Sequence, residues 1–138
     1  MDRPDYATLA EAAIAARSLA YAPYSRFQVG AAVLTSSGRL FQGGNIENAA
    51  YPMTVCAERV ALFSAYAAGE REIVALAVVT DTDDVASPCG ACRQVIFELA
   101  PRATLLLLNT RGAQRVVRPQ DLLPHGFGPA QIGEAEGR

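Results

Sequence analysis

Two short stretches contain every cysteine of the chain, and they place three thiols and one carboxylate at spacings typical of a metal site. The first is Cys56-Ala57-Glu58, and the second is Pro88-Cys89-Gly90-Ala91-Cys92. Zn²⁺ binds thiolates well, and a catalytic Zn²⁺ keeps one of its four positions open. We therefore predict that Cys56, Cys89 and Cys92 hold one Zn²⁺ per subunit, with Glu58 beside it as the acid/base group.

Both stretches are expected to begin a helix. Thr54 is the predicted N-cap of a helix over residues 56–68, and a second helix is predicted to carry Cys89 and Cys92 in its first turn and to end near Ala100. Free N–H groups in a first turn favour a negative thiolate, and side chains there can lean over the open end of the helix. A ligand and a base can then share one site.

Arg59 and Arg93 each directly follow motif residues. Three thiolates leave Zn²⁺ with a net negative charge, which weakens it as a Lewis acid. We predict that one or both arginines donate hydrogen bonds to ligand sulfurs and withdraw that charge.

A structural zinc would need a fourth ligand from the protein. The single histidine, His125, lies between Pro124 and Gly126 in a C-terminal loop and is the only candidate. A binding module with a purely structural zinc is therefore the alternative from another functional class, and Glu58 argues against it.

At these residues the sequence resembles the zinc-dependent cytidine deaminases, in their short-chain form with three cysteine ligands. The spacing of C-A-E and a C-x-x-C after proline, 33 positions apart from cysteine to cysteine, is specific, whereas C-x-x-C alone is weak. The similarity covers nearly the whole chain and includes these further stretches: Tyr21-Ala22-Pro23-Tyr24-Ser25, Phe27-Gln28-Val29-Gly30-Ala31, Asn45-Ile46-Glu47-Asn48-Ala49, Arg93-Gln94 and Leu122-Leu123-Pro124 to Phe127.

The resemblance implies a hydrolase that acts on a cyclic amidine C–N bond. It would deaminate cytidine and 2′-deoxycytidine to uridine and 2′-deoxyuridine with release of ammonia, in pyrimidine nucleoside salvage, and would be a homotetramer. It also implies substrate contacts: Phe27 stacks on the pyrimidine, Asn45 and Glu47 bind ribose, the Ala57 N–H binds the base carbonyl, the Ser87 carbonyl receives the amino group, and Tyr51 and Phe127 complete a neighbouring subunit's pocket.

Without the resemblance, several of these residues have ordinary interpretations. Phe27, Tyr51 and Phe127 would be packing residues, and Asn45 and Glu47 would be turn residues. As a pair, an amide and a carboxylate suit sugar hydroxyls, and the carboxylate would repel a 5′-phosphate. Deaminases of other aminated bases remain alternatives, namely those acting on a blasticidin-type antibiotic, guanine or an RNA base.

The order of apolar patterns predicts an α/β fold. Residues 5–20 read as a helix, 28–35 and 40–45 as an antiparallel hairpin turning at Ser36-Ser37-Gly38, and 73–80 and 104–109 as buried strands. A short strand near Val116-Val117 and a short helix from Pro119 to Leu123 follow. We expect one domain over residues 1–138, with three αβα layers, a mixed five-stranded sheet whose later strands are parallel, and a loosely ordered tail after about residue 128.

Composition excludes several classes of protein. The net charge is −2 and the 12 basic residues, all arginine, are scattered, which weighs against a nucleic-acid partner. With the resemblance, this leaves a small-molecule nucleoside as the expected substrate. Three cysteines assigned to one metal site imply a reducing compartment. Asp2, Arg3 and Asp5 interrupt any signal peptide, and the longest aliphatic run, 105–108, cannot span a membrane. We expect a cytoplasmic protein.

Overall fold

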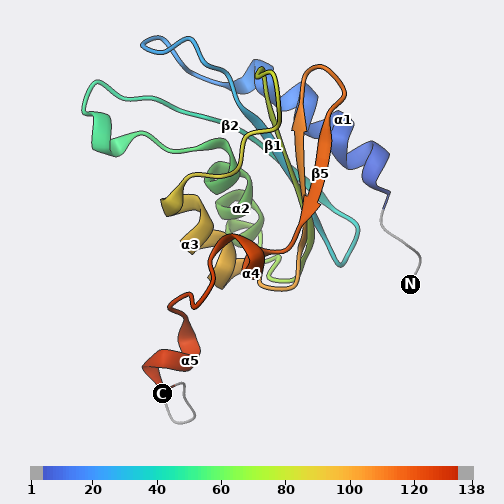
Figure 1. Ribbon diagram of the computed structural model, residues 1–138, viewed down its shortest axis with the longest axis vertical. Coiled ribbons are helices and arrows are strands. Elements are labelled where there is room, and N and C mark those ends of the chain that lie inside the picture. The colour runs from blue at the N-terminus through green and yellow to red at the C-terminus, as the bar shows by residue number, and fades with distance from the viewer. Residues whose placement is uncertain (1–4, 134–138) are drawn as a thin grey trace.

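The computed structural model describes residues 5–133 and shows one five-stranded sheet with helices on both faces (Figure 1). The strand order is β2-β1-β3-β4-β5. The strands are β1 (Gly30–Thr35), β2 (Leu40–Gly44), β3 (Ile73–Thr80), β4 (Thr104–Asn109) and β5 (Gln114–Val117).

The sheet is mixed, as predicted. β1 pairs antiparallel with β2 and with β3, and β3 pairs parallel with β4. The expectation that the later strands are parallel holds for this pair only, because β5 runs antiparallel to β4. Only residues 110–113 join β4 to β5, with Gly112 at φ 92°, and a parallel crossover needs about a dozen residues or more.

Two apolar clusters fill the spaces on either side of the sheet. On one face, α1 (Tyr6–Ala16) buries Leu9 and Ala13 against strand residues that include Leu106. On the other face, α2 (Ala57–Ala67) and α3 (Gly90–Leu99) pack on the alternate strand residues, including Leu105 and Leu107. This period-two alternation confirms the three-layer αβα arrangement.

Helix α2 lies directly on the backbone of β2. A Cβ atom added at Gly43 would stand 2.6 Å from the Ala61 nitrogen and 2.7 Å from the Ala57 oxygen. Glycine therefore lets the helix approach, and the alanines at 57, 61 and 65 complete the close packing by being fully buried. This contact fixes where the N-terminal end of α2 lies.

The helix boundaries differ from the predicted ones in two places. The first helix ends as a 3₁₀ turn, η1 (Arg17–Leu19), after α1. Thr54 is not the N-cap of α2: it ends the 3₁₀ turn η2 (Tyr51–Met53), and its hydroxyl accepts a hydrogen bond from the Asn48 N–H at 3.2 Å. The N-caps of α2 and α3 are Cys56 and Cys89 themselves.

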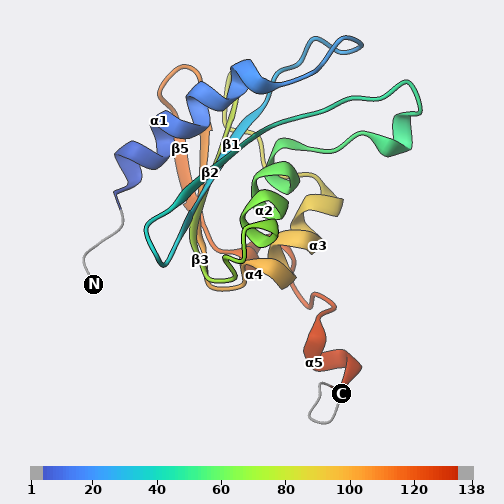
Figure 2. The ribbon, with the colours of Figure 1, turned by 180° about the vertical axis from the view of Figure 1, so that it is seen from behind.

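Two long loops extend from the same end of the sheet, as both ribbon views show (Figures 1 and 2). They span residues 20–29 and 45–56, and isolated bridges join Tyr21 to Ile46 and Ile46 to Val55. The loop between β3 and α3 lies near this end too.

The C-terminal segment contains α4 (Pro119–Leu122) and α5 (Pro129–Ile132). Part of the predicted loose tail, residues 134–138, lies outside the described residues. Within residues 5–133, none of the helices combines the length and apolar character needed to cross a membrane.

Candidate metal centre and adjoining cavities

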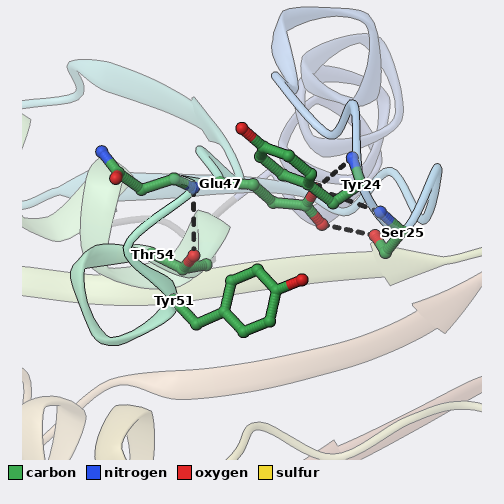
Figure 3. Close-up of a pocket in the computed structure, with 6 residues that line it drawn as sticks. Tyr24, Ser25, Glu47, Tyr51 and Thr54 are labelled. Atoms are coloured by element: carbon green, nitrogen blue, oxygen red, sulfur yellow. Dashed lines mark hydrogen bonds between the residues drawn. The ribbon is translucent and has the colours of Figure 1, made fainter.

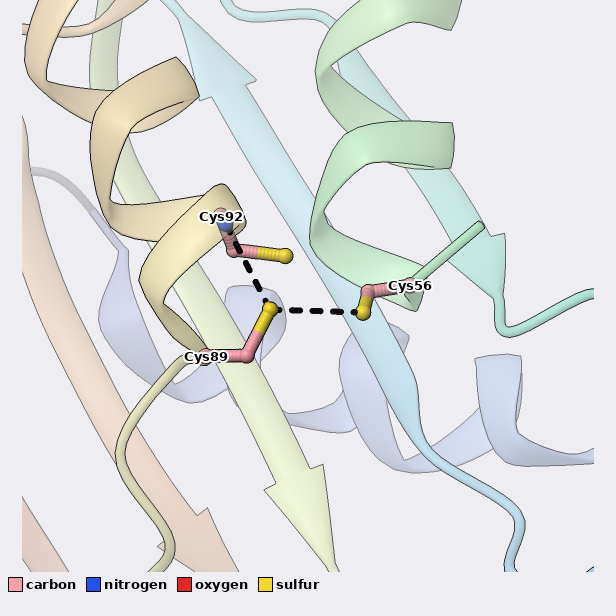
Figure 4. Close-up of side chains that lie close together, drawn as sticks. All are labelled: Cys56, Cys89 and Cys92. Carbon is pink, nitrogen blue, oxygen red and sulfur yellow. Dashed lines mark hydrogen bonds between the residues drawn. The ribbon is translucent and has the colours of Figure 1, made fainter. Parts of the chain in front are cut away.

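The two helix N-termini bring the three cysteines together (Figure 4). Their sulfur atoms all lie within 4.8 Å of one another, and the Sγ atoms of Cys56 and Cys89 are 3.7 Å apart. Sulfurs about 2.3 Å from a tetrahedral Zn²⁺ would be about 3.8 Å apart. The donor set and its spacing therefore fit zinc, as the motif spacing predicts.

The electrostatics of the cluster favour a thiolate at Cys56. Hydrogen bonding from Cys92, supported by Arg59 and Cys89, lowers the pKa of Cys56 to about 5 despite its partial burial. The same interaction with Cys56 raises the pKa of Cys92, which is fully buried. The Cys92 N–H also points at Cys89 Sγ at 3.5 Å, so the first turn of α3 contributes its free donors to the cluster.

The two arginines have different partners. The Arg59 guanidinium donates to Cys56 Sγ at 3.6 Å, in agreement with the predicted contact to a sulfur. Arg93 has no such contact within the described residues. Its guanidinium donates instead to the Pro88 carbonyl at 2.8 Å, the Leu122 carbonyl at 3.0 Å and the Ser87 hydroxyl.

Glu58 is 5% exposed and lies in the first turn of α2, two residues from Cys56. Burial raises the pKa of Glu58 to about 7, and the negative charge of Cys56 adds to the effect. Glu58 is not a member of the cysteine cluster. A carboxyl group with a pKa near neutrality beside a metal site is suited to taking up and releasing protons.

A cavity of about 220 Å³ opens beside this cluster. Phe27 and Asn45 line it together with Cys56, Glu58 and Cys89. The other lining residues are Val29, Thr54, Ala57, Val78, Thr80, Ala86, Ser87 and Pro88. The structure therefore gathers most of the predicted substrate residues around one space.

Glu47 lines a different cavity, which has a volume of about 430 Å³ (Figure 3). Tyr24, Ser25, Asn48, Tyr51 and Thr54 line it as well. Thr54 belongs to both cavities, so the two spaces adjoin. Tyr51 is 72% exposed, and its ring lies edge-on to that of Tyr24, with centroids 6.2 Å apart.

Phe127 and His125 lie outside both cavities. Phe127 is 59% exposed, and its backbone carbonyl accepts a hydrogen bond from the Gln94 side chain at 2.8 Å. His125, at φ 59°, is not a member of the cysteine cluster. Among the described residues, no fourth side chain joins the three thiols.

The sequence analysis assigned no role to Ser25 and an incorrect one to Thr54. Ser25 contacts Glu47 directly, and Thr54 lies where the two cavities meet. Ser25 belongs to a stretch that supports the family resemblance, but no spacing rule relates it to Glu47, 22 positions later. Only the paired loops bring these two residues together.

Comparisons with known proteins agree with this site. The model of the family described as the cytidine and deoxycytidylate deaminase zinc-binding region matches residues 4–108. A cytidine deaminase of Halalkalibacterium halodurans is 52% identical over 124 residues, which cover 89% of this chain and 94% of that protein. One from Mycobacterium tuberculosis is 42% identical over 112 residues, or 79% of each chain.

The fold is shared as well. The crystal structure of cytidine deaminase from Burkholderia pseudomallei matches with a TM-score of 0.87 at 52% identity, covering 90% of this chain and 100% of that one. The matched zinc-binding region contains all three cysteines, so Zn²⁺ is the cofactor. Because sequence, fold and metal site agree over most of the length, this chain belongs to the cytidine and deoxycytidylate deaminase family and is a zinc-dependent hydrolase.

Proposed function

We propose that this enzyme deaminates cytidine and 2′-deoxycytidine to uridine and 2′-deoxyuridine, releasing ammonia, and that it serves pyrimidine nucleoside salvage. One observation carries the proposal: buried Glu58 shares a cavity with two of three clustered thiols, with Phe27 and with Asn45. That cavity combines a metal site, an acid/base group, an aromatic surface and a polar amide.

Each residue of the metal centre has a distinct role in this proposal. Cys56, Cys89 and Cys92 hold the Zn²⁺, which when bound supplies Lewis-acid activation of water at neutral pH. Glu58 takes one proton from the attacking water and passes it to the ring nitrogen. It then takes the second proton from the hydroxyl group now bonded to the ring carbon and gives it to the departing amine, which leaves as ammonia. Its raised pKa suits this, because the carboxyl group must hold and lose a proton in each turnover.

The base is bound by groups that face the same cavity. The exposed side of Phe27 stacks on the pyrimidine ring. Ala57 is the first residue of α2, so its N–H has no acceptor within the helix and is available to the base carbonyl. The Ser87 carbonyl accepts from the amino group, while Arg93 holds the Ser87 hydroxyl and the Pro88 carbonyl in place.

The sugar is bound where the two cavities adjoin. Asn45 donates one amide hydrogen to the Phe27 carbonyl at 2.8 Å and accepts from the Val29 N–H at 2.9 Å. A second amide hydrogen and an oxygen lone pair remain for a sugar hydroxyl. Glu47 supplies the carboxylate of the pair, and its negative charge disfavours a 5′-phosphate.

The proposal includes the assembly and the location of the protein. The exposed residues Tyr51 and Phe127 complete the pockets of neighbouring subunits in a homotetramer. Residues 1–138 form one domain. Because all three cysteines are assigned to one metal site, the proposal leaves none for disulfides, which favours a cytoplasmic location.

A substrate panel tests the proposal. The fall in ultraviolet absorbance is measured with cytidine, 2′-deoxycytidine, cytidine 5′-monophosphate, a blasticidin-type antibiotic and guanine. The expected result is turnover of the two nucleosides, with the monophosphate far slower. Comparable turnover of cytidine and its monophosphate would overturn the choice of nucleoside, and activity on the antibiotic or guanine alone would assign the site to another aminated base.

A further inference from the structure

The Ser25 hydroxyl lies between two residues of the proposed substrate site. Its Oγ–H donates to Oε2 of Glu47 (Figure 3), and the same hydroxyl oxygen accepts from the Phe27 N–H at 3.0 Å. The other carboxylate oxygen of Glu47 accepts from the N–H groups of Tyr24 at 2.9 Å and Ser25 at 3.2 Å. One hydroxyl thus connects the carboxylate in one cavity to the aromatic residue in the other.

The same network continues to Asn45. The Asn45 side chain holds the Phe27 carbonyl and the Val29 N–H, and the Asn45 carbonyl accepts from the Tyr21 N–H at 2.8 Å. Asn45 therefore holds the two ends of the loop of residues 20–29, and Glu47 holds its tip.

Arg26 shows that this loop needs to be held. It lies between Ser25 and Phe27 with φ at 60°, in the left-handed backbone region that residues other than glycine rarely adopt. The hydrogen bonds of Ser25 and Phe27 on either side keep the chain in this conformation.

The bonds to Glu47 leave it little remaining capacity. An ionised carboxylate has about four acceptor positions, and the hydrogen bonds from Tyr24 and Ser25 occupy three of them. These bonds also lower the pKa of Glu47, with the Ser25 hydroxyl as the largest cause, so the carboxylate is charged at neutral pH. One position on Oε2 remains, and Glu47 lines the cavity of about 430 Å³.

We propose that Ser25 is the positioning residue of the sugar site. Its hydroxyl holds the Glu47 carboxylate so that the one free acceptor position of Glu47 binds a single sugar hydroxyl. The same hydroxyl holds the Phe27 backbone in its place beside the sugar site. The proposal rests on the function proposed above. It predicts that the enzyme distinguishes the two ribose hydroxyls sharply, because Glu47 has capacity for one of them.

The test compares the zinc-loaded full chain with three single variants and one double variant. Ser25→Ala removes both hydrogen bonds of the hydroxyl, whereas Ser25→Thr keeps the hydroxyl and adds a methyl group to an exposed position. Glu47→Gln removes the charge that Ser25 contacts, and the double variant Ser25→Ala/Glu47→Gln shows whether Ser25 acts through it. Substrates are cytidine, 2′-deoxycytidine and 3′-deoxycytidine.

In the parent, we expect the loss of one hydroxyl to lower kcat/KM by about tenfold or more, and the loss of the other to have little effect. Ser25→Ala should raise the KM for cytidine by about tenfold, because the variant loses the hydrogen bond to the charged Glu47 carboxylate. Its kcat should stay within about threefold of the parent value, and its zinc content should be unchanged. The difference between the two deoxy substrates should shrink. Ser25→Thr should have the KM and kcat of the parent. In the Glu47→Gln background, adding Ser25→Ala should change the KM little.

Three results would overturn the role of Ser25 while leaving the proposed function intact. They are an unchanged KM in Ser25→Ala, equal losses in Ser25→Ala and Ser25→Thr, or an undiminished effect of Ser25→Ala in the Glu47→Gln background. A parent enzyme that acts on no pyrimidine nucleoside would refute the proposed function itself, and the role of Ser25 with it. The parent measurement alone distinguishes these cases.

Discussion

Cys56, Glu58 and Arg59 lie within four consecutive positions, yet the fold gives each a different environment. Cys56 is half-buried at the N-terminal end of α2 and its pKa is lowered, whereas Glu58 is buried and its pKa is raised. Arg59 reaches back one turn to Cys56 Sγ, and among the described residues its buried Nε has no hydrogen-bond partner. A charge that is partly desolvated and aimed at a sulfur is expected to influence the metal more than the fold.

Arg59→Gln tests that influence. The variant loses the charged donor to Cys56 Sγ, so kcat should fall by about 10- to 100-fold, as is typical when an outer partner of a metal ligand is removed. Zinc content, measured by metal analysis, should stay at the parent value. Arg71→Gln is the matched control, because Arg71 stacks on Tyr66 away from the cluster. Parent-like turnover in Arg59→Gln would remove this role.

Asn109 is a buried amide whose four hydrogen-bonding positions are all used. Its Nδ2 donates to the carbonyls of Thr82 at 2.9 Å and Asp83 at 3.1 Å. Its Oδ1 accepts from the N–H groups of Arg111 at 3.0 Å and Ala113 at 2.8 Å. Asn109 therefore ties the start of the loop that leads to Cys89 to the turn between β4 and β5.

Asn109→Asp should destabilise the protein because it sets a carboxylate against two carbonyl oxygens. The expected loss is about 1–3 kcal/mol in the free energy of unfolding, measured by urea denaturation. Asn48→Asp is the control, since the Asn48 side chain accepts from the Ala50 N–H and a carboxylate can do the same. Equal stability of the two variants would contradict the importance of these donor bonds.

At the scale of whole elements, the position of α2 on β2 determines where Cys56 and Glu58 lie. Gly43→Ala places a Cβ 2.6–2.7 Å from backbone atoms of α2, which cannot move aside as a flexible side chain would. We expect a loss of about 1–3 kcal/mol or more in unfolding free energy. Gly90→Ala is the matched control because an added Cβ there has no atom within 4 Å. If both variants unfold at the same urea concentration, the close packing is not needed.

Helix and strand positions followed well from apolar periodicity, but their ends and partners did not. Thr54 looked like an N-cap because threonine commonly is one, and a 3₁₀ turn uses it instead. Arg93 is one of two candidate donors to the sulfurs on sequence grounds, because it follows Cys92. Its guanidinium is occupied by three acceptors, one of them from Leu122, and no local spacing reveals that partner.

At the scale of the whole molecule, the metal centre lies beside the core rather than within it. The clusters on the two faces of the sheet consist of aliphatic residues, and Cys92 is the only zinc-site cysteine fully buried in them. The strands and α1 contain none of the three cysteines, which lie at the starts of α2 and α3. The fold should therefore survive the loss of zinc.

Chelation of zinc separates a catalytic from a structural metal. We expect chelated protein to lose turnover and to melt at a lower temperature, while its far-ultraviolet circular dichroism at 25 °C stays that of a folded α/β protein. Ligands that bind the native state raise its stability by mass action, which accounts for the lower melting point. Added Zn²⁺ should restore activity. A coil spectrum after chelation would indicate a structural zinc module.

The sequence identified the metal residues more fully than the substrate space. Two fixed spacings sufficed to predict that the three cysteines form one cluster, because each spacing lies within a single helix start. The acid/base role of Glu58 stays a prediction. Asn45 and Glu47 were treated as one pair, yet Asn45 lines the cavity beside the cysteines and Glu47 the adjoining one. That division depends on how the loops of residues 20–29 and 45–56 fold together, which is a property of the whole molecule.

The most direct test of whether Glu58 and the three-thiol site perform the deamination is to measure ammonia release from cytidine together with uridine formation. The parent and Glu58→Gln are compared at equal zinc content. We predict that the parent forms the two products in equal amounts. The variant should bind the same zinc and lose about 10²- to 10⁴-fold or more in turnover, because its amide cannot carry the proton. Brisk turnover by Glu58→Gln, or none by the folded, zinc-loaded parent, would contradict this mechanism.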